Sequence, residues 1–147
     1  LLLGWQSVLI ACVLMFWFET ANGYTKPAGQ QRKSQSSITG TYEQGNNDLG
    51  SELIVKELPG KRIKFSLYSY WRCPDGSACN GSANGVVPLK NSMAEYRQTD
   101  PAFAYVLRLR FSHSACLVEC NAPSNFGGFN VDPSGNYRKV SSKAKIN

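Results

Sequence analysis

The amino-acid sequence predicts an all-β protein, an antiparallel sandwich or a small closed barrel of about eight short strands. Three observations predict this class. Apolar and polar residues alternate in several segments, clusters of Gly, Pro, Asn and Asp separate those segments, and no segment shows a helical period over about eleven residues. Similar triplets, Gly-Thr-Tyr at 40–42 and Gly-Asn-Tyr at 135–137, begin the first and last expected strands. Pairing these two strands would remove two exposed edges, which favours closure.

The start of the chain is typical of an export signal. Residues 8–18 form an apolar run, shorter than the roughly 20 residues of a membrane span, and small residues follow it. This pattern predicts a signal peptide over residues 1–23, cleavage before Tyr24, and a periplasmic or secreted protein. Two less favoured alternatives are a lipoprotein, since residues 9–12 resemble a lipid-attachment motif ending at Cys12, and a retained anchor.

Basic residues gather in two segments that flank the expected domain. Residues 24–37 are polar and lack an apolar rhythm, which predicts a disordered linker, and residues 141–147 form a basic tail. The chain has a net charge of +6, but residues 38–137 balance nine basic with nine acidic residues. Nucleic-acid binding requires a basic stripe on the folded face, so it is not expected. The tails are expected to make only weak contacts with anionic surfaces.

The folded domain is expected over residues 38–140, and its first half is predicted as strands separated by turns. After the first strand, two strands flank a turn at 58–61, and apolar residues alternate with polar ones from Ile63 to Leu67. Residues 72–85 are rich in Gly, Asn and Ser, a composition that predicts a long loop.

The second half of the domain is predicted as further strands with a clear hairpin. Alternate residues from Phe103 and Tyr105 onward share one face of the hairpin, and its turn lies at 112–114. A second turn at 133–135 separates the last two strands. The expected strands lie at 86–89, 93–97, 103–111, 116–120, 128–132 and 135–140.

Four cysteines follow the predicted cleavage site, an even number that predicts two disulfides in a small exported chain. Their spacing does not reveal which of the possible connectivities applies. A metal site is not expected, because the spacings are Cys-x5-Cys and Cys-x3-Cys whereas zinc sites favour Cys-x2-Cys. The disulfide candidates are Cys73, Cys79, Cys116 and Cys120.

The titratable residues do not form a catalytic pattern. His113 lies in an expected turn between Ser112 and Ser114, where neighbouring residues rarely reach the geometry of a base and a nucleophile. The acidic residues are scattered, and no phosphate-binding, dinucleotide-binding or His-Glu-x-x-His motif occurs. We therefore expect a binding protein rather than an enzyme, with no cofactor.

Two stretches carry residue types that favour binding. A disulfide between Cys73 and Cys79 would hold the loop at 73–85 in one shape and lower the entropy cost of binding. Residues 70–72, Tyr-Trp-Arg, are of types enriched in interface hot spots. Each stretch also has a structural explanation, as a stapled connection and as packed side chains.

The segment "FGGFNVDPSGNYRK" at 126–139 resembles the C-terminal end of bacterial periplasmic inhibitors of invertebrate-type (i-type) lysozyme. Weaker similarity extends over residues 38–140, in the stretches "GTYE", "IKFSLYS", "AEYR" and "LRLRF". The resemblance implies an all-β periplasmic protein whose partner is a lysozyme, i-type before others.

The resemblance also implies a binding site at the Ser-Gly-x-Tyr motif. Lysozymes cleave glycans with two carboxyl groups across a cleft, which an exposed loop of the inhibitor would enter. Ser134 would hydrogen-bond those carboxylates, Gly135 would shape the turn, and Tyr137 would add a hydroxyl and apolar contact. Two alternatives stay open: ordinary turn chemistry with the tyrosine in the core, and a structural or envelope-associated domain with basic tails. The implied partner-binding residues are Ser134, Gly135, Asn136, Tyr137 and Arg138.

Overall fold

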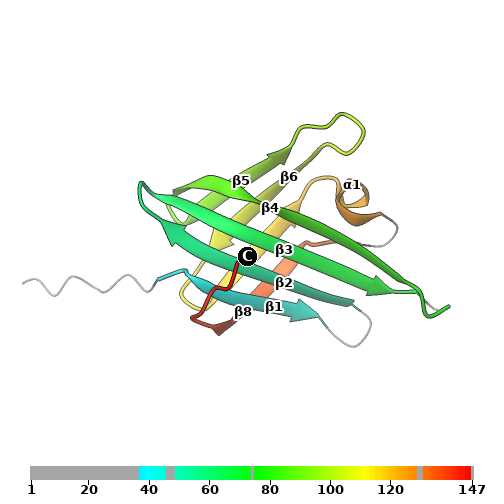
Figure 1. Cartoon of the computed structure of the whole chain (residues 1–147), viewed down its shortest axis with the longest axis horizontal. Helices are drawn as coiled ribbons and strands as arrows, with labels where there is room; N and C mark the ends of the chain where they lie inside the picture. The colour runs from blue at the N-terminus through cyan, green and yellow to red at the C-terminus, as the bar shows by residue number, and fades with distance from the viewer. Residues whose placement is uncertain (1–36, 46–48, 74, 129–130, 147) are drawn as a thin grey trace, which may run out of the picture. The chain divides into compact units, whose positions relative to one another are not determined.

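The computed structural model describes residues 37–45, 49–73, 75–128 and 131–146, which form a closed antiparallel barrel of eight strands (Figure 1). Each strand pairs with the next in the chain, and β1 pairs with β8 to close the barrel. The predicted all-β class is confirmed, in its barrel form. The strands are β1 (Gly40–Gly45), β2 (Leu49–Leu58), β3 (Arg62–Arg72), β4 (Ala78–Lys90), β5 (Met93–Gln98), β6 (Tyr105–Phe111), β7 (Ala115–Cys120) and β8 (Gly135–Ser141).

The core fills the barrel interior, because every second side chain of a strand faces inward. On β2 and β3, for example, Leu53 lies opposite Leu67, and both are fully buried. Every second residue of β6 from Tyr105 to Phe111 is buried as well, which confirms the predicted alternation. Phe103 was expected on the same face, but this is wrong: it lies before β6 begins and is 59% exposed.

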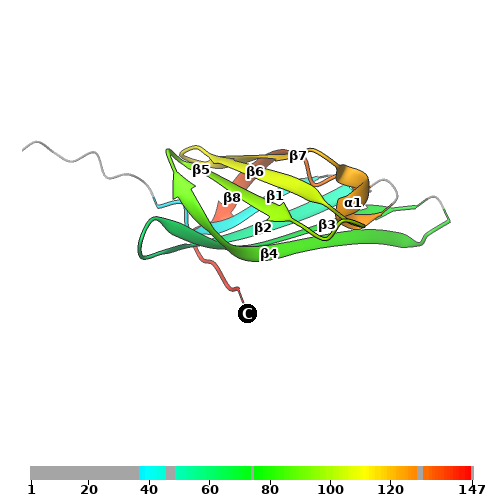
Figure 2. The same cartoon turned by 90° about the horizontal axis from the view of Figure 1, so that it is seen from above.

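The connections differ between the two ends of the barrel. Tight turns join β2 to β3 at 59–61, β4 to β5 at 91–92 and β6 to β7 at 112–114. In an up-and-down barrel these turns share one end, where β1 also begins and β8 ends. At the other end β3 and β4 continue as a long hairpin, and the short helix α1 (Pro123–Gly127) lies beside it (Figures 1 and 2). We call these the tight-turn end and the α1 end.

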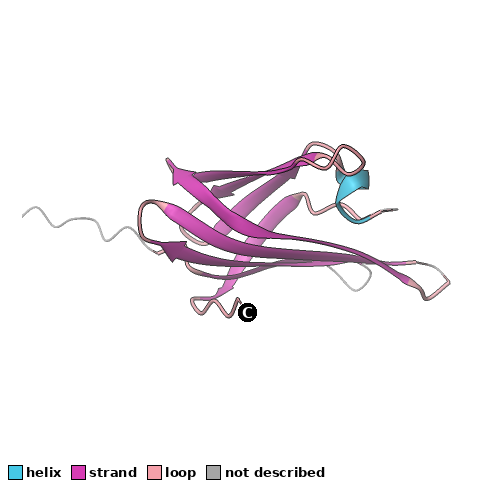
Figure 3. Ribbon diagram, turned by 45° about the horizontal axis from the view of Figure 1, so that its top comes forward, coloured by secondary structure: helices cyan, strands magenta, loops and turns pink. Residues whose placement is uncertain are grey.

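The segment before β8 differs from the prediction. A strand at 128–132 and a turn at 133–135 are predicted, but the structure has α1 followed by residues 131–134 outside any strand (Figure 3). Pro123 in the first turn favours the start of the helix. A helix of five residues is too short to produce a helical period in the sequence.

The loop predicted over 72–85 is wrong for most of its length, because β4 already begins at Ala78. Gly81 and Gly85 lie within the strand and face the interior. Aromatic rings there occupy the space that a side chain at these two positions would take. A Cβ on Gly81 would lie 2.7 Å from Cδ1 of Phe126. These glycines therefore allow aromatic rings to approach β4 closely, and they do not interrupt the strand.

Several predictions concern the ends of the chain. The export signal at 1–23, the lipoprotein alternative at Cys12 and the linker up to residue 36 lie outside the described residues. Within the described residues, no helix has the length and apolar character needed to cross a membrane. The basic tail lies beside β1, since the hydroxyl of Thr41 donates to the carbonyl oxygen of Lys143 at 3.0 Å.

Candidate partner-binding surface

Ser134 is half-buried and already hydrogen-bonded within the barrel. Its hydroxyl accepts a hydrogen bond from the backbone N–H of Cys120 at 3.0 Å, and its carbonyl oxygen accepts one from Nε2 of Gln44 at 3.0 Å. Its own N–H donates to Oδ1 of Asp132 at 2.8 Å. Ser134 therefore fastens the segment before β8 to β7 and β1. It does not stand at the tip of an exposed turn.

Tyr137 is fully buried inside the barrel. Its hydroxyl donates to the carbonyl oxygen of Pro133 at 2.7 Å. Burial raises the pKa of Tyr137, while hydrogen bonds with Ser51 and Ser69 act in the opposite direction. These two serines also hydrogen-bond one another at 2.7 Å. A partner can touch this ring only if the barrel opens.

The Gly-x-Tyr part of the motif occurs twice in the barrel. At the start of β1, Tyr42 is fully buried and its hydroxyl donates to the carbonyl oxygen of Ile38 at 2.7 Å, four residues earlier, as Tyr137 does. The glycines that precede the two tyrosines have φ of 159° at Gly40 and 150° at Gly135. A Cβ at either glycine would collide with an atom of the neighbouring terminal strand. Glycine and tyrosine thus serve to bring β1 and β8 together.

The other two implied partner-binding residues, Asn136 and Arg138, are exposed on the outer face of β8. Arg138 lies opposite Glu43 on β1, and Glu43 lies opposite Glu52 on β2. Glu52 in turn lies opposite Tyr68 on β3. This row lines an outer groove of about 400 Å³, which we call the seam groove because it crosses the pairing of β1 with β8. Residues that line it include Glu43, Gly50, Glu52, Tyr68, Tyr70 and Arg138.

Two tyrosines supply apolar surface to the seam groove. Tyr68 is 45% exposed, and its ring centroid lies 6.5 Å from that of Tyr70. The ring of Tyr70 lies so close to Gly50 that a Cβ there would collide with it. Further along β3, Trp71 packs against the core and Arg72 is exposed. Of the predicted Tyr-Trp-Arg stretch, the tyrosine therefore belongs to this groove.

The charges of the seam groove are available to a partner. None of the ion pairs found among the described residues includes Arg138, Glu43 or Glu52. Glu43 and Glu52 repel one another because they lie directly opposite on neighbouring strands, and a cation from a partner would relieve that repulsion. The guanidinium of Arg138 can bind a carboxylate through two parallel hydrogen bonds. The groove thus combines both signs of charge with two aromatic rings.

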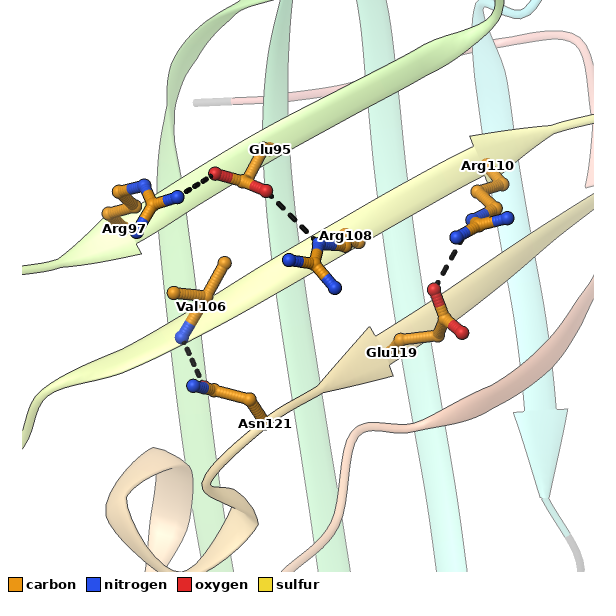
Figure 4. Close-up of polar contacts among 7 residues, drawn as sticks. All are labelled: Glu95, Arg97, Val106, Arg108, Arg110, Glu119 and Asn121. Carbon is orange, nitrogen blue, oxygen red and sulfur yellow. Dashed lines mark hydrogen bonds and ion pairs between the residues drawn. The ribbon is translucent and has the colours of Figure 1, made fainter.

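The wall formed by β5, β6 and β7 carries ion pairs of its own (Figure 4). The carboxylate of Glu95 accepts hydrogen bonds from Arg97 at 2.5 Å and from Arg108 at 3.1 Å, and Glu119 pairs with Arg110 at 3.2 Å. Both β6 arginines, Arg108 and Arg110, are exposed and point away from the core. Because these cations are already held in ion pairs, this wall is a weaker candidate for binding than the seam groove.

The remaining predicted residues lie apart from the seam groove. No disulfide joins the four described cysteines, so the two predicted disulfides are not confirmed, although the sulfurs of Cys73 and Cys79 lie 3.8 Å apart. Cys116 is fully buried, and His113 is exposed in the turn between β6 and β7. In the part of the chain that the structure describes, no three or more His, Cys, Asp or Glu side chains cluster as metal ligands would.

The sequence alone does not single out Glu43, Glu52 or Tyr68 as site residues. Each occupies an outward position of its strand, which alternation can indicate. Their adjacency depends on the register of three strands, which turn geometry and packing decide. A search for outward-facing charged and aromatic residues at equal distances from the turns would have found them.

The chain is a small β-barrel with an exposed groove that crosses three strand pairings. No family model, no curated protein and no solved structure matches the chain.

Proposed function

We propose that this chain is an exported, cofactor-free binding protein that inhibits a lysozyme, i-type before others, through its seam groove. The observation that carries the proposal is the position of Arg138, an exposed cation on the outer face of β8, directly opposite Glu43 of the acidic pair on β1 and β2. Ser134 and Tyr137 act as supports in this proposal, because their hydroxyls are already engaged inside the barrel.

The chemistry of the seam groove suits such a partner. The lysozyme cleft presents two carboxyl groups, and Arg138 offers them paired, charge-assisted hydrogen bonds. Tyr68 and Tyr70 add large and rigid contact surfaces, the kind enriched in interface hot spots. Glu43 and Glu52 would meet cationic side chains at the rim of the partner, which sets orientation and association rate.

The test is a cell-lysis assay with i-type and c-type lysozymes in the presence of the purified chain. We expect protection from lysis that Arg138→Ala weakens about 10- to 150-fold, the equivalent of about 1.5–3 kcal/mol for a charged hydrogen bond. Arg110→Ala is the matched control, since it removes an exposed arginine from a different wall. Absence of protection at micromolar protein would refute the inhibitor proposal, and equal losses in both variants would refute the seam groove as its site.

A second candidate function is an envelope-associated β domain that contacts anionic surfaces. It is favoured by the tight-turn end, where a cationic side chain of β8 lies beside the first described residue: Nζ of Lys139 donates to the carbonyl oxygen of Ser37 at 2.6 Å. Sedimentation with anionic and neutral lipid vesicles tests it. Binding to anionic vesicles that persists after removal of residues 24–36 and 142–147 would contradict a role for the tails.

A further inference from the structure

We propose that Cys73 and Cys79 form a disulfide across the tip of the β3–β4 hairpin, and that Cys116 and Cys120 remain thiols. This assignment chooses one local bond from the connectivities that the cysteine spacing allows. It does not depend on lysozyme being the partner.

The hairpin already brings the two sulfurs together. Cys79 lies opposite Trp71 in the β3–β4 ladder, and Cys73 follows β3 by one residue. Their sulfurs lie 3.8 Å apart, so an approach of about 1.8 Å reaches the length of a disulfide bond. Side-chain rotation supplies movements of this size without a change of strand register.

Hydrogen bonds join the described residues on either side of position 74. The N–H of Cys73 donates to the carbonyl oxygen of Ser77 at 2.8 Å, and the N–H of Gly76 donates back to Cys73 at 2.9 Å. Asp75 accepts hydrogen bonds from both the N–H and the hydroxyl of Ser77, at 2.9 and 2.6 Å. These contacts hold Cys73 next to Ser77, two residues before Cys79, before any bond forms between the sulfurs.

The other pairings are excluded by the strands that carry the cysteines. Cys116 and Cys120 lie on the same face of β7, four residues apart, which places their Cα atoms about 13 Å apart, whereas a disulfide tolerates about 7 Å. β7 is separated from β4 by β5 and β6, which puts roughly 14 Å of barrel wall between Cys79 and either β7 cysteine. Cys116 is also fully buried, opposite Phe111 and Tyr137.

The bond requires an oxidant, which a disulfide such as oxidised glutathione supplies. One cysteine thiolate attacks a sulfur of that disulfide and releases the first glutathione thiolate, leaving a mixed disulfide. The second cysteine thiolate then attacks the cysteine sulfur of the mixed disulfide and releases the other glutathione. The two protons and two electrons lost by the protein end on the two glutathione thiols. The product fixes the hairpin tip that follows Trp71 and Arg72, at the end of the strand that carries Tyr68 and Tyr70.

Trypsin provides a direct test on the full chain after incubation with oxidised glutathione. Cleavage after Arg72, Lys90, Arg110 and Arg138 leaves Cys73 and Cys79 together in peptide 73–90, and Cys116 and Cys120 together in peptide 111–138. The protein is unfolded in an alkylating reagent before digestion and then analysed by mass spectrometry. We expect peptide 73–90 to resist alkylation and to be about 2 Da lighter than its reduced form, with both cysteines of peptide 111–138 alkylated.

Each other result contradicts the proposal. A covalent link between the two peptides would show a bond between the hairpin and β7, and full alkylation of peptide 73–90 would show that no bond forms at the tip. Loss of alkylation in peptide 111–138 would contradict the assignment of free thiols. In Cys79→Ser, Cys73 should carry either the alkyl group or one glutathione, and no internally bonded peptide 73–90 should form, whereas the matched change Cys120→Ser should leave the bond in peptide 73–90 intact.

Discussion

Gly81 is the point at which α1 meets the barrel, and replacing it with alanine tests how α1 is held. The added Cβ would lie 2.6 Å from Cα of Gly127, and 2.7 Å from both Cδ1 and the carbonyl oxygen of Phe126. Two of these three atoms belong to the backbone, so a rotamer change cannot relieve the contact. Gly81→Ala must push α1 away from β4.

The expected loss of stability follows from that overlap. Overpacking of this kind costs about 1–3 kcal/mol, and it is offset in part because alanine is favoured over glycine in a strand by roughly 0.5–1 kcal/mol. Gly85→Ala is the matched control, because it changes the same strand on the same interior side. There the nearest atom is Cε2 of Tyr96 at 3.2 Å, part of a side chain that can move. We expect Gly85→Ala to change stability by no more than about 0.5 kcal/mol.

Urea denaturation of the two variants and the parent protein measures this difference. Gly81→Ala should lower the midpoint with an unchanged slope, and should lower the melting temperature by about 4–8 °C for each kcal/mol lost. Equal midpoints for Gly81→Ala and Gly85→Ala would refute the argument that close backbone contact fixes α1. A change of slope in Gly81→Ala alone would show instead that α1 detaches from an otherwise folded barrel.

Two further predictions concern the buried tyrosines. Tyr137→Phe should lower the free energy of unfolding, measured by urea denaturation, by about 1–3 kcal/mol, because the carbonyl oxygen of Pro133 loses its donor. The folded variant should still inhibit lysozyme as the parent does. A loss of inhibition without a loss of stability would point to direct contact between Tyr137 and the partner. Burial raises the pKa of Tyr42 from 10.0 to about 12, so between these two pH values the unfolded chain loses a proton that the folded chain keeps. The ionisation of Tyr42 should therefore leave the free energy of unfolding unchanged below pH 10.0 and lower it from there toward pH 12. The fall should be smaller in Tyr42→Phe. Tyrosinate absorbance and urea midpoints measured across this pH range check the sign.

Alternation along single strands made much of the barrel predictable from the sequence. The inward positions of β3 and β6 and the turn at 112–114 follow from local pattern and turn chemistry. The loop prediction for β4 was wrong because it read Gly81 and Gly85 as loop residues, whereas they make room for neighbouring aromatic rings. Composition cannot distinguish a glycine in a loop from a glycine that makes room for a ring. The ring next to Gly81 belongs to Phe126, which lies far away in the sequence.

The candidate site was less predictable than the fold. Inward and outward positions alternate along β8, so of the five implied residues from Ser134 to Arg138 only Asn136 and Arg138 are exposed, which the prediction of a loop tip did not anticipate. The acidic pair and Tyr68 become neighbours only through the register of β1, β2 and β3. Such a row is not visible within any single segment of the sequence, because its members come from separate strands.

The pairing of β1 with β8 joins the two segments of the barrel that lie farthest apart along the chain. Contacts between such distant segments form slowly, because a long stretch of chain must be ordered before they are made. Arg138 and Glu43 belong to opposite sides of this junction, and they lie in the same groove. A partner that grips both residues therefore holds the first and last strands together. Its binding should be visible as slower unfolding of the whole barrel, even when the partner touches only its surface.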